Sequence, residues 1–183
     1  ITATSLLCRN LRQLGAAADY FIPHRQKDGY GLHKETLDEI IAGGARLIVT
    51  VDCGISAVEE AAAAKDKVDL IITDHHLPGK ELPKALAVID PHRADCPYPD
   101  KNIAGVGVAF KLCQALWQKM RGKAFTGDLD IVALGTVADV VPLLGENRKI
   151  VQQGLRVLKK SKRPGIQALL AVTELQEKEI TAG

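Results

Sequence analysis

Apolar residues recur at helical spacing at the start of the chain and again through its last third. Residues 3–14 (ATSLLCRNLRQL) predict an amphipathic helix that ends near Gly15, and residues 35–42 predict a second helix that ends at Gly43 and Gly44. Four further segments with the same periodicity predict a helical C-terminal part, over residues 104–120, 128–138, 147–160 and 165–173.

Short, uninterrupted apolar runs predict β-strands between these helices. The runs cover residues 46–52 (RLIVTVD), 68–73 (VDLIIT) and 86–89, and a shorter strand-like run covers residues 20–23. A helix from Ser56 to about Lys65 separates the first two runs, and Ser56 with Glu59 predicts a capping box at its start. Because continuous apolar runs suit strands buried on both faces, the pattern predicts an α/β fold, a parallel sheet flanked by helices.

Composition narrows the class of protein. With 183 residues, 46% of them hydrophobic, the chain can form one globular domain with a core, or one domain and the start of another. A net charge of +2 does not by itself mark a nucleic-acid binder, and 4% aromatic residues exclude widespread base stacking. The four cysteines form no CxxC pair, which disfavours structural zinc and disulfides. With no membrane-length apolar run and no secretory signal, we expect a cytoplasmic protein without a membrane partner.

Potential metal ligands follow two of the predicted strands. Asp52 ends the first run, and Asp74, His75 and His76 follow the second. Functional groups gather at the carboxyl ends of parallel strands, so neighbouring strands would bring all four side chains into one crevice. Asp52 alone could form a turn before Gly54, but two adjacent histidines behind an Asp exceed what a structural role requires. Imidazole and carboxylate together suit Mn²⁺, Fe or Zn²⁺, whereas Mg²⁺ sites are richer in oxygen ligands.

Two other segments carry candidate chemistry. Asp139 lies in the apolar segment LGTVADVVPL, where a carboxylate needs a metal or hydrogen-bond donors, although it could equally cap the next segment. Gly105 and Gly107 precede an amphipathic helix whose N–H groups could bind phosphate, although such a glycine pair is common. We expect the three isolated histidines to occupy surface or loop positions; they are His24, His33 and His92. The basic run at 159–163 is more typical of a solvated helix end than of a DNA contact.

The motifs, taken in order, carry a resemblance. VDCG, TDHH, AGVGVAFKL and LGTVADVVPL resemble the signature of the DHH phosphoesterase family. Within that family the fuller similarity is to the RecJ type of exonuclease, through IPHRQKDGYGL, IVTVDCGIS, IITDHHLPG, AVIDPH, ALGTVADVVPL and RPGIQALL, and it covers nearly the entire chain. The resemblance implies hydrolysis of phosphodiester bonds at a two-metal site with Mn²⁺ (or Mg²⁺). It also implies 5′-to-3′ degradation of single-stranded DNA to mononucleotides, in DNA repair and recombination.

The same resemblance implies roles for individual residues. It implies three metal ligands: Asp52, His75 and Asp139. It places His76 beside the scissile phosphate and makes Asp74 the group that orients the histidine pair. It implies contact with the substrate at four further positions: Gly105, Gly107, Arg25 and Tyr30.

The resemblance also predicts the domain organisation. Residues 1–145 correspond to the DHH core without its first strand and its Asp-rich first motif, and residues 146–183 to a helical continuation. Because that motif supplies aspartate ligands, we expect an N-terminally truncated fragment with an incomplete metal site and little or no nuclease activity of its own. No protein partner is predicted.

Two alternatives stay open. The chain could belong to a DHH enzyme that acts on oligonucleotides or dinucleotides, which the GYGL and ADVVPL motifs disfavour. It could also be a non-catalytic DHH-like scaffold, which the retained Asp52, His75, His76 and Asp139 disfavour.

Overall fold

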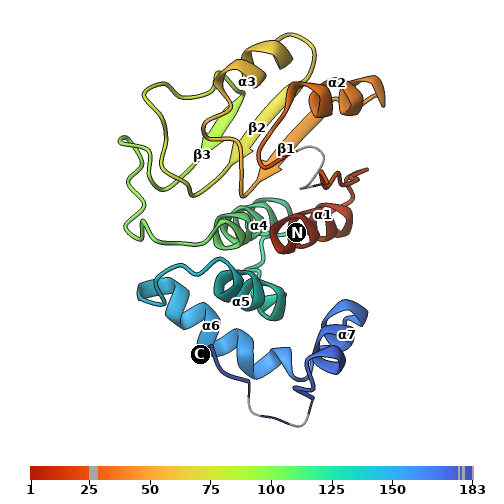
Figure 1. The fold of residues 1–183 in the computed structure, drawn as a ribbon, viewed down its shortest axis with the longest axis vertical. Coiled ribbons are helices and arrows are strands. Elements are labelled where there is room, and N and C mark those ends of the chain that lie inside the picture. The colour runs from red at the N-terminus through yellow and green to blue at the C-terminus, as the bar shows by residue number, and fades with distance from the viewer. Residues whose placement is uncertain (25–28, 177, 179, 183) are drawn as a thin grey trace.

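The computed structural model describes residues 1–24, 29–176, 178 and 180–182. In this described part of the chain, three strands and seven helices form three layers, with the sheet and two helices at the top of Figure 1, α1 and α4 in the middle, and the remaining helices below. In chain order they are α1 (Thr2–Gln13), α2 (Lys34–Ala42), β1 (Leu47–Val51), α3 (Val58–Ala64), β2 (Asp69–Thr73), β3 (Ala87–Ile89), α4 (Gly105–Arg121), α5 (Leu129–Ala138), α6 (Gly145–Leu158) and α7 (Pro164–Val172).

The sheet is parallel and its strands follow one another in the order β1-β2-β3. Leu47 pairs with Asp69 across the first two strands, and Ile71 pairs with Ala87 across the second two. Since the three strands share one direction, their carboxyl ends meet at one edge. The predicted strand at residues 20–23 is wrong: this segment has no regular structure, and no described strand pairs with it, so its exposed apolar side chains belong to a loop.

Helices cover both faces of the sheet, as the continuous apolar runs predict. Ile48, Leu70 and Ile72 turn toward α2 and α3, where they pack with Leu37 and other buried residues. On the opposite face, Val49 and Val51 pack against the larger core cluster that α1, α4 and α5 contribute to. Alternate residues of one strand therefore enter two different cores, which explains why the strands show no polar face.

The start of α3 differs from its prediction. The helix begins at Val58 after Ala57, and no side chain caps it, so the predicted capping box of Ser56 and Glu59 is wrong. The N–H of Ile55, which lies just before the helix, donates instead to the Asp74 carboxylate at 2.9 Å. A long-range contact to the end of β2 therefore shapes this turn in place of a local cap.

The lower helices form the predicted helical C-terminal part. Helices α5 and α6 pack so closely that a Cβ atom at Gly154 would overlap the Ala133 side chain. The larger core cluster is one group of buried residues that extends from Ala3 in α1 to Leu170 in α7. The boundary between residues 1–145 and 146–183 stays a prediction. Among the described residues, no helix is both long enough and apolar enough to cross a membrane.

A polar cluster connects α1 with the start of α5 and with the loop between α6 and α7, and we call it the helix junction. Its members are Asn10, Asp128, Asp130, Ser161 and Arg163. Asn10 is fully buried; its amide donates to Asp128 at 2.9 Å and its carbonyl accepts the Trp117 indole N–H at 2.8 Å. Asp130 accepts hydrogen bonds from Ser161 at 2.6 Å and from Arg163 at 3.0 Å. Arg163, from the basic run at 159–163, thus serves as a structural ion-pair partner.

Candidate metal centre

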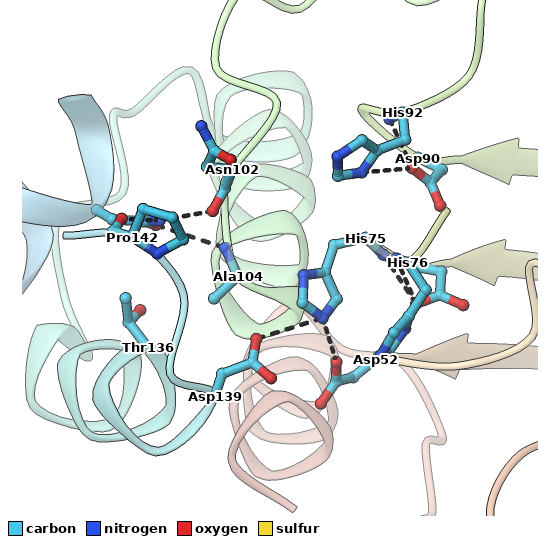
Figure 2. Close-up of polar contacts among 12 residues, drawn as sticks. Asp52, His75, His76, Asp90, His92, Asn102, Ala104, Thr136, Asp139 and Pro142 are labelled. Atoms are coloured by element: carbon cyan, nitrogen blue, oxygen red, sulfur yellow. Dashed lines mark hydrogen bonds and ion pairs between the residues drawn. The ribbon is translucent and has the colours of Figure 1, made fainter. Parts of the chain in front are cut away.

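Three ligand atoms from three separate segments converge at the carboxyl edge of the sheet (Figure 2). The His75 Nε2 atom lies 3.1 Å from Asp52 Oδ1 and 3.3 Å from Asp139 Oδ2. All three atoms are buried, and none has a hydrogen-bond partner in the described part of the chain. Buried polar atoms are normally satisfied, so this arrangement costs free energy unless something binds between them. Two carboxylate oxygens and an imidazole nitrogen form a donor set that fits a divalent cation.

Asp52 is held in place by its backbone and by the residues around it. Its N–H donates to the carbonyl of Thr73 at 2.9 Å, which extends the β1–β2 ladder by one residue. Its φ angle of 62° lies in the left-handed region, which is uncommon for a non-glycine residue and turns the side chain out of the strand direction. Gly105 at the start of α4 packs directly on the Asp52 side chain, and a Cβ atom there would lie 2.6 Å from its Cγ.

Asp74 fixes the histidine pair. Its side chain is 2% exposed; one oxygen accepts the Ile55 N–H, and the other accepts the His75 N–H at 2.8 Å. The second oxygen also lies 2.6 Å from His76 Nδ1. A carboxylate at Nδ1 orients the ring and leaves Nε2 as the outward nitrogen of His76. One ligand atom from each of these residues and Asp52 lies within 4.8 Å of the others.

The electrostatics keep the neighbours of the ligands protonated. Burial of Tyr30, and next the charge of Asp52, raise the pKa of its phenol well above the usual value, so Tyr30 remains a hydrogen-bond donor. Burial, and next the charge of Asp74, raise the pKa of Cys53 to about 11, which makes it a thiol at neutral pH. For His75, burial lowers the pKa, but Asp52 and Asp139 together outweigh burial and leave it above its usual value.

Asp139 ends α5, and a strained loop follows it. Val140 has a φ angle of 58° and is 87% exposed, a rare combination for a β-branched residue. The fully buried Asn147 fixes the loop, because its amide donates to the Pro142 carbonyl at 3.1 Å and to the Asn102 carbonyl at 2.6 Å. Sequence reasoning missed Asn147, since its shorter hydrogen bond goes to Asn102, 45 positions away in the sequence.

The predicted substrate residues lie at different depths. Gly105 and Gly107 are both buried in α4, where Gly107 packs against Ile103 with no room for a Cβ atom. Close packing explains each glycine, and contact with phosphate stays a prediction. Tyr30 is 61% exposed; its hydroxyl donates to the Asp52 carbonyl at 2.8 Å and lies 3.3 Å from His76 Nε2. Arg25 lies outside the described residues.

A cavity of about 320 Å³ opens beside His76, on the side of the ring that faces Tyr30. Its lining includes His33, Ser56 and Glu60. His33 lies in the loop directly before α2, as predicted, but its Nε2 atom is buried without a hydrogen-bond partner among the described residues. The cavity is large enough for part of a nucleotide next to the metal ligands.

Comparison with known proteins places the chain in a family. The DHH family, N-terminal domain, matches residues 1–136. The chain is 45% identical over 174 residues to the single-stranded-DNA-specific exonuclease RecJ of Bacillus subtilis, covering 94% of this chain and 22% of that protein. It is 45% identical over 197 residues to the protein of the same name from Escherichia coli, covering 99% of this chain and 34% of that protein. The chain thus spans about a third or less of the length of these relatives.

Solved structures share the fold. A crystal structure of exonuclease RecJ bound to manganese matches with a TM-score of 0.87 at 37% identity, over 99% of this chain and 46% of that chain. RecJ from Thermus thermophilus in complex with Mn²⁺ matches with a TM-score of 0.79 at 34% identity, over 97% of this chain and 26% of that one. These matches confirm the predicted parallel sheet with flanking helices and the predicted resemblance. The chain belongs to the DHH family.

Proposed function

We propose that this chain is part of the catalytic core of a metal-dependent exonuclease of the RecJ type, which hydrolyses phosphodiester bonds in single-stranded DNA. The observation that carries the proposal is the convergence at the strand ends of three buried ligand atoms that lack hydrogen bonds among the described residues, from Asp52, His75 and Asp139. The similarity to RecJ proteins of the same fold supports the choice of substrate.

Mn²⁺ is the proposed physiological cation, with Mg²⁺ as a substitute. A mixed imidazole and carboxylate donor set suits Mn²⁺ better than Mg²⁺, and similar RecJ structures contain Mn²⁺ in two cases and Mg²⁺ in another. When bound, a pair of such cations lowers the pKa of a coordinated water and offsets the negative charge that develops on the phosphate.

The residues around the ligands supply orientation and proton transfer. Asp74 holds the His76 ring through Nδ1, so His76 Nε2 is the atom that can exchange a proton with a group near the phosphate. Its neighbour, the Tyr30 hydroxyl, keeps its proton and limits the rotation of the ring. His76 is 44% exposed on its side chain and therefore accessible to a substrate.

The described residues bring three ligand atoms to one point, which is fewer than two cations require. We therefore expect the 183-residue chain alone to bind Mn²⁺ weakly and to show little or no nuclease activity. Strand polarity from 5′ to 3′, release of mononucleotides, a role in DNA repair and recombination, and a cytoplasmic location belong to the same proposal and rest on the similarity to RecJ proteins.

The decisive experiment is a nuclease assay of the gene product that carries this sequence, in Mn²⁺. The substrates are 5′-labelled and 3′-labelled single strands, a duplex and a dinucleotide. Asp139→Ala is the test variant, and Asp38→Ala, an exposed carboxylate on α2, is the matched control.

The outcomes separate the three candidate functions. Release of mononucleotides from 5′ ends of single strands, lost in Asp139→Ala and kept in Asp38→Ala, supports the RecJ-type function. Activity confined to the dinucleotide assigns the protein to the small-substrate DHH enzymes. Absence of activity on every substrate supports a non-catalytic scaffold and contradicts the proposal.

A further inference from the structure

The end of β3 repeats the arrangement found at the end of β2. Asp74 follows β2 directly, and His76 lies two residues later; Asp90 follows β3 directly, and His92 lies two residues later. In both pairs the Asp is buried and its Oδ1 accepts the backbone N–H of the His, at 3.4 Å for His76 and 2.7 Å for His92. Neighbouring parallel strands thus deliver two Asp-x-His units to the same edge of the sheet.

The second unit has the unsatisfied atoms that mark a functional group. The Asp90 side chain is fully buried, and its Oδ2 atom has no hydrogen-bond partner among the described residues. The Nδ1 atom of His92 is also buried without a partner there, 3.8 Å from Asp90 Oδ1. A unit that served stability alone would close this gap with a hydrogen bond, because an unpaired buried polar atom costs free energy.

The position of the second unit relates it to the metal ligands. Figure 2 shows the His92 ring extending from the end of β3 toward the start of α4, above His75 in the view. Asp90 is close enough to the site that Asp74 and His75 both influence its pKa, which burial raises above the usual value. The His92 side chain is 25% exposed, so the predicted loop position is right but the ring is not fully solvated.

The loop that carries His92 is held firmly. Lys101 donates to the Pro91 carbonyl at 2.7 Å and to the Cys96 carbonyl at 2.8 Å, and Arg93 donates to the Val88 carbonyl. These bonds bracket His92 on both sides in the sequence. A ring with a fixed backbone and an unpaired nitrogen is preorganised for a ligand.

We propose that the imidazole of His92 contacts a backbone phosphate of the single strand, with Asp90, which accepts the His92 backbone N–H, as the residue that positions this segment. The inference rests on the proposed function for the choice of substrate. An imidazole beside a carboxylate donates readily to a phosphate oxygen, and the N-terminus of α4 favours an anion on the same side of the site. His92 then binds a different phosphate oxygen, or a neighbouring linkage, from the one that His76 approaches.

The test compares His92→Ala, His92→Gln and Asp90→Asn with the unchanged gene product in Mn²⁺. Asp95→Ala is the matched control, because this exposed residue lies on the same loop and pairs only with Arg93 among the described residues. We expect His92→Ala to lower kcat/KM on a single strand by about ten- to a hundredfold, the range for one charge-assisted hydrogen bond. Glutamine retains an N–H donor, so His92→Gln is expected to recover part of the loss, while Asp95→Ala leaves the activity unchanged.

A chemically modified substrate distinguishes contact from a structural role. Strands are prepared with one uncharged methylphosphonate linkage, placed in turn at each position near the scissile bond. At the linkage that His92 contacts, the unchanged protein and His92→Ala should cleave at the same rate, because the contact is already absent. A structural role would lower cleavage of every strand by the same factor.

Binding of a labelled single strand without turnover, followed by fluorescence anisotropy, separates this inference from the proposed function. If the unchanged protein cleaves nothing, the proposed function fails. The contact is still supported if His92→Ala binds the strand more weakly than the unchanged protein and if a methylphosphonate at one linkage removes this difference in binding. Equal binding and equal cleavage by His92→Ala and the unchanged protein would overturn it.

Discussion

The strand-end site and the helix junction are both clusters of polar side chains inside the molecule, yet they are built in opposite ways. In the helix junction, Asp128 and Asp130 are bonded to Asn10, Ser161 and Arg163. At the strand ends, by contrast, the candidate ligand atoms of Asp52, His75 and Asp139 meet without a hydrogen bond among the described residues. A cluster that stabilises the fold satisfies its own atoms, whereas a binding cluster keeps them for a ligand.

The largest expected effect separates activity from stability at the strand ends. Asp52→Asn should lower the nuclease activity of the gene product by at least about a thousandfold, since it removes a ligand and its charge. The free energy of unfolding without metal should change by less than about 1 kcal/mol, because Asp52 Oδ1 has no hydrogen bond to lose and its ion pair with His75 involves a side chain that is 38% exposed. Activity assays and urea unfolding measure the two quantities, and a variant that unfolds would contradict the comparison.

Asn10→Ala should show the converse at the helix junction. Truncation leaves the Trp117 indole N–H and the Asp128 carboxylate short of a partner inside the core, so the free energy of unfolding should fall by about 2–3 kcal/mol. Arg12→Ala on the same helix breaks an exposed ion pair with Asp19 and an exposed hydrogen bond to the Ala18 carbonyl, and it serves as the control, with an expected loss under about 1 kcal/mol. Equal losses in the two variants, measured by urea unfolding, would remove the distinction between the clusters.

Cation binding should stabilise the protein through the strand-end site alone. At a Mn²⁺ concentration about a hundredfold above its Kd, linkage predicts a gain of about 2.7 kcal/mol and a rise in Tm of several degrees. Chelation with EDTA should reverse the rise, and Asp139→Asn should abolish it, whereas Asn10→Ala should show the same rise from a lower starting Tm. A rise that persists in Asp139→Asn would place the cation elsewhere.

The smallest expected effect concerns acid sensitivity of the helix junction. Burial raises the pKa of Asp130, but hydrogen bonds from Ser161 and the Ile131 N–H, with Arg163, outweigh it and leave the pKa below its usual value. A group with a lowered folded-state pKa contributes stability that is present above its unfolded value and lost as pH falls through the folded value. Ser161→Ala should therefore reduce the acid-induced part of the stability loss below about pH 4, as measured by unfolding at about pH 3 and pH 6.

Sequence patterns predicted the regular elements well because those elements depend on local periodicity. The strand ends at Asp52 and Asp74 followed from two buried apolar runs, and parallel pairing then brought both acids to one edge. The false strand at residues 20–23 and the missing cap at Ser56 show where pattern fails: a strand needs a partner, and the turn before α3 is positioned by a bond from the Ile55 N–H to the distant Asp74 carboxylate.

The residues that support the candidate site could not be predicted from the sequence, because their interactions also depend on residues that are distant in the chain. Asn147 donates to the Asn102 carbonyl across 45 positions of sequence, and the role proposed for Asp90 follows only once β3 lies beside β2. Neither residue type signals its role without its partners. The candidate metal ligands could be proposed from the sequence because their residue types are themselves informative.

The contact between Gly105 and Asp52 has a consequence for how the protein tolerates mutation. Any larger residue at position 105 must displace the Asp52 carboxylate or the first turn of α4, although glycine itself takes no part in chemistry. In a scan of all single substitutions, position 105 should be as intolerant as the ligands when variants are selected for activity. A selection for abundance alone should accept alanine there more readily, because a small shift of one side chain relieves the overlap.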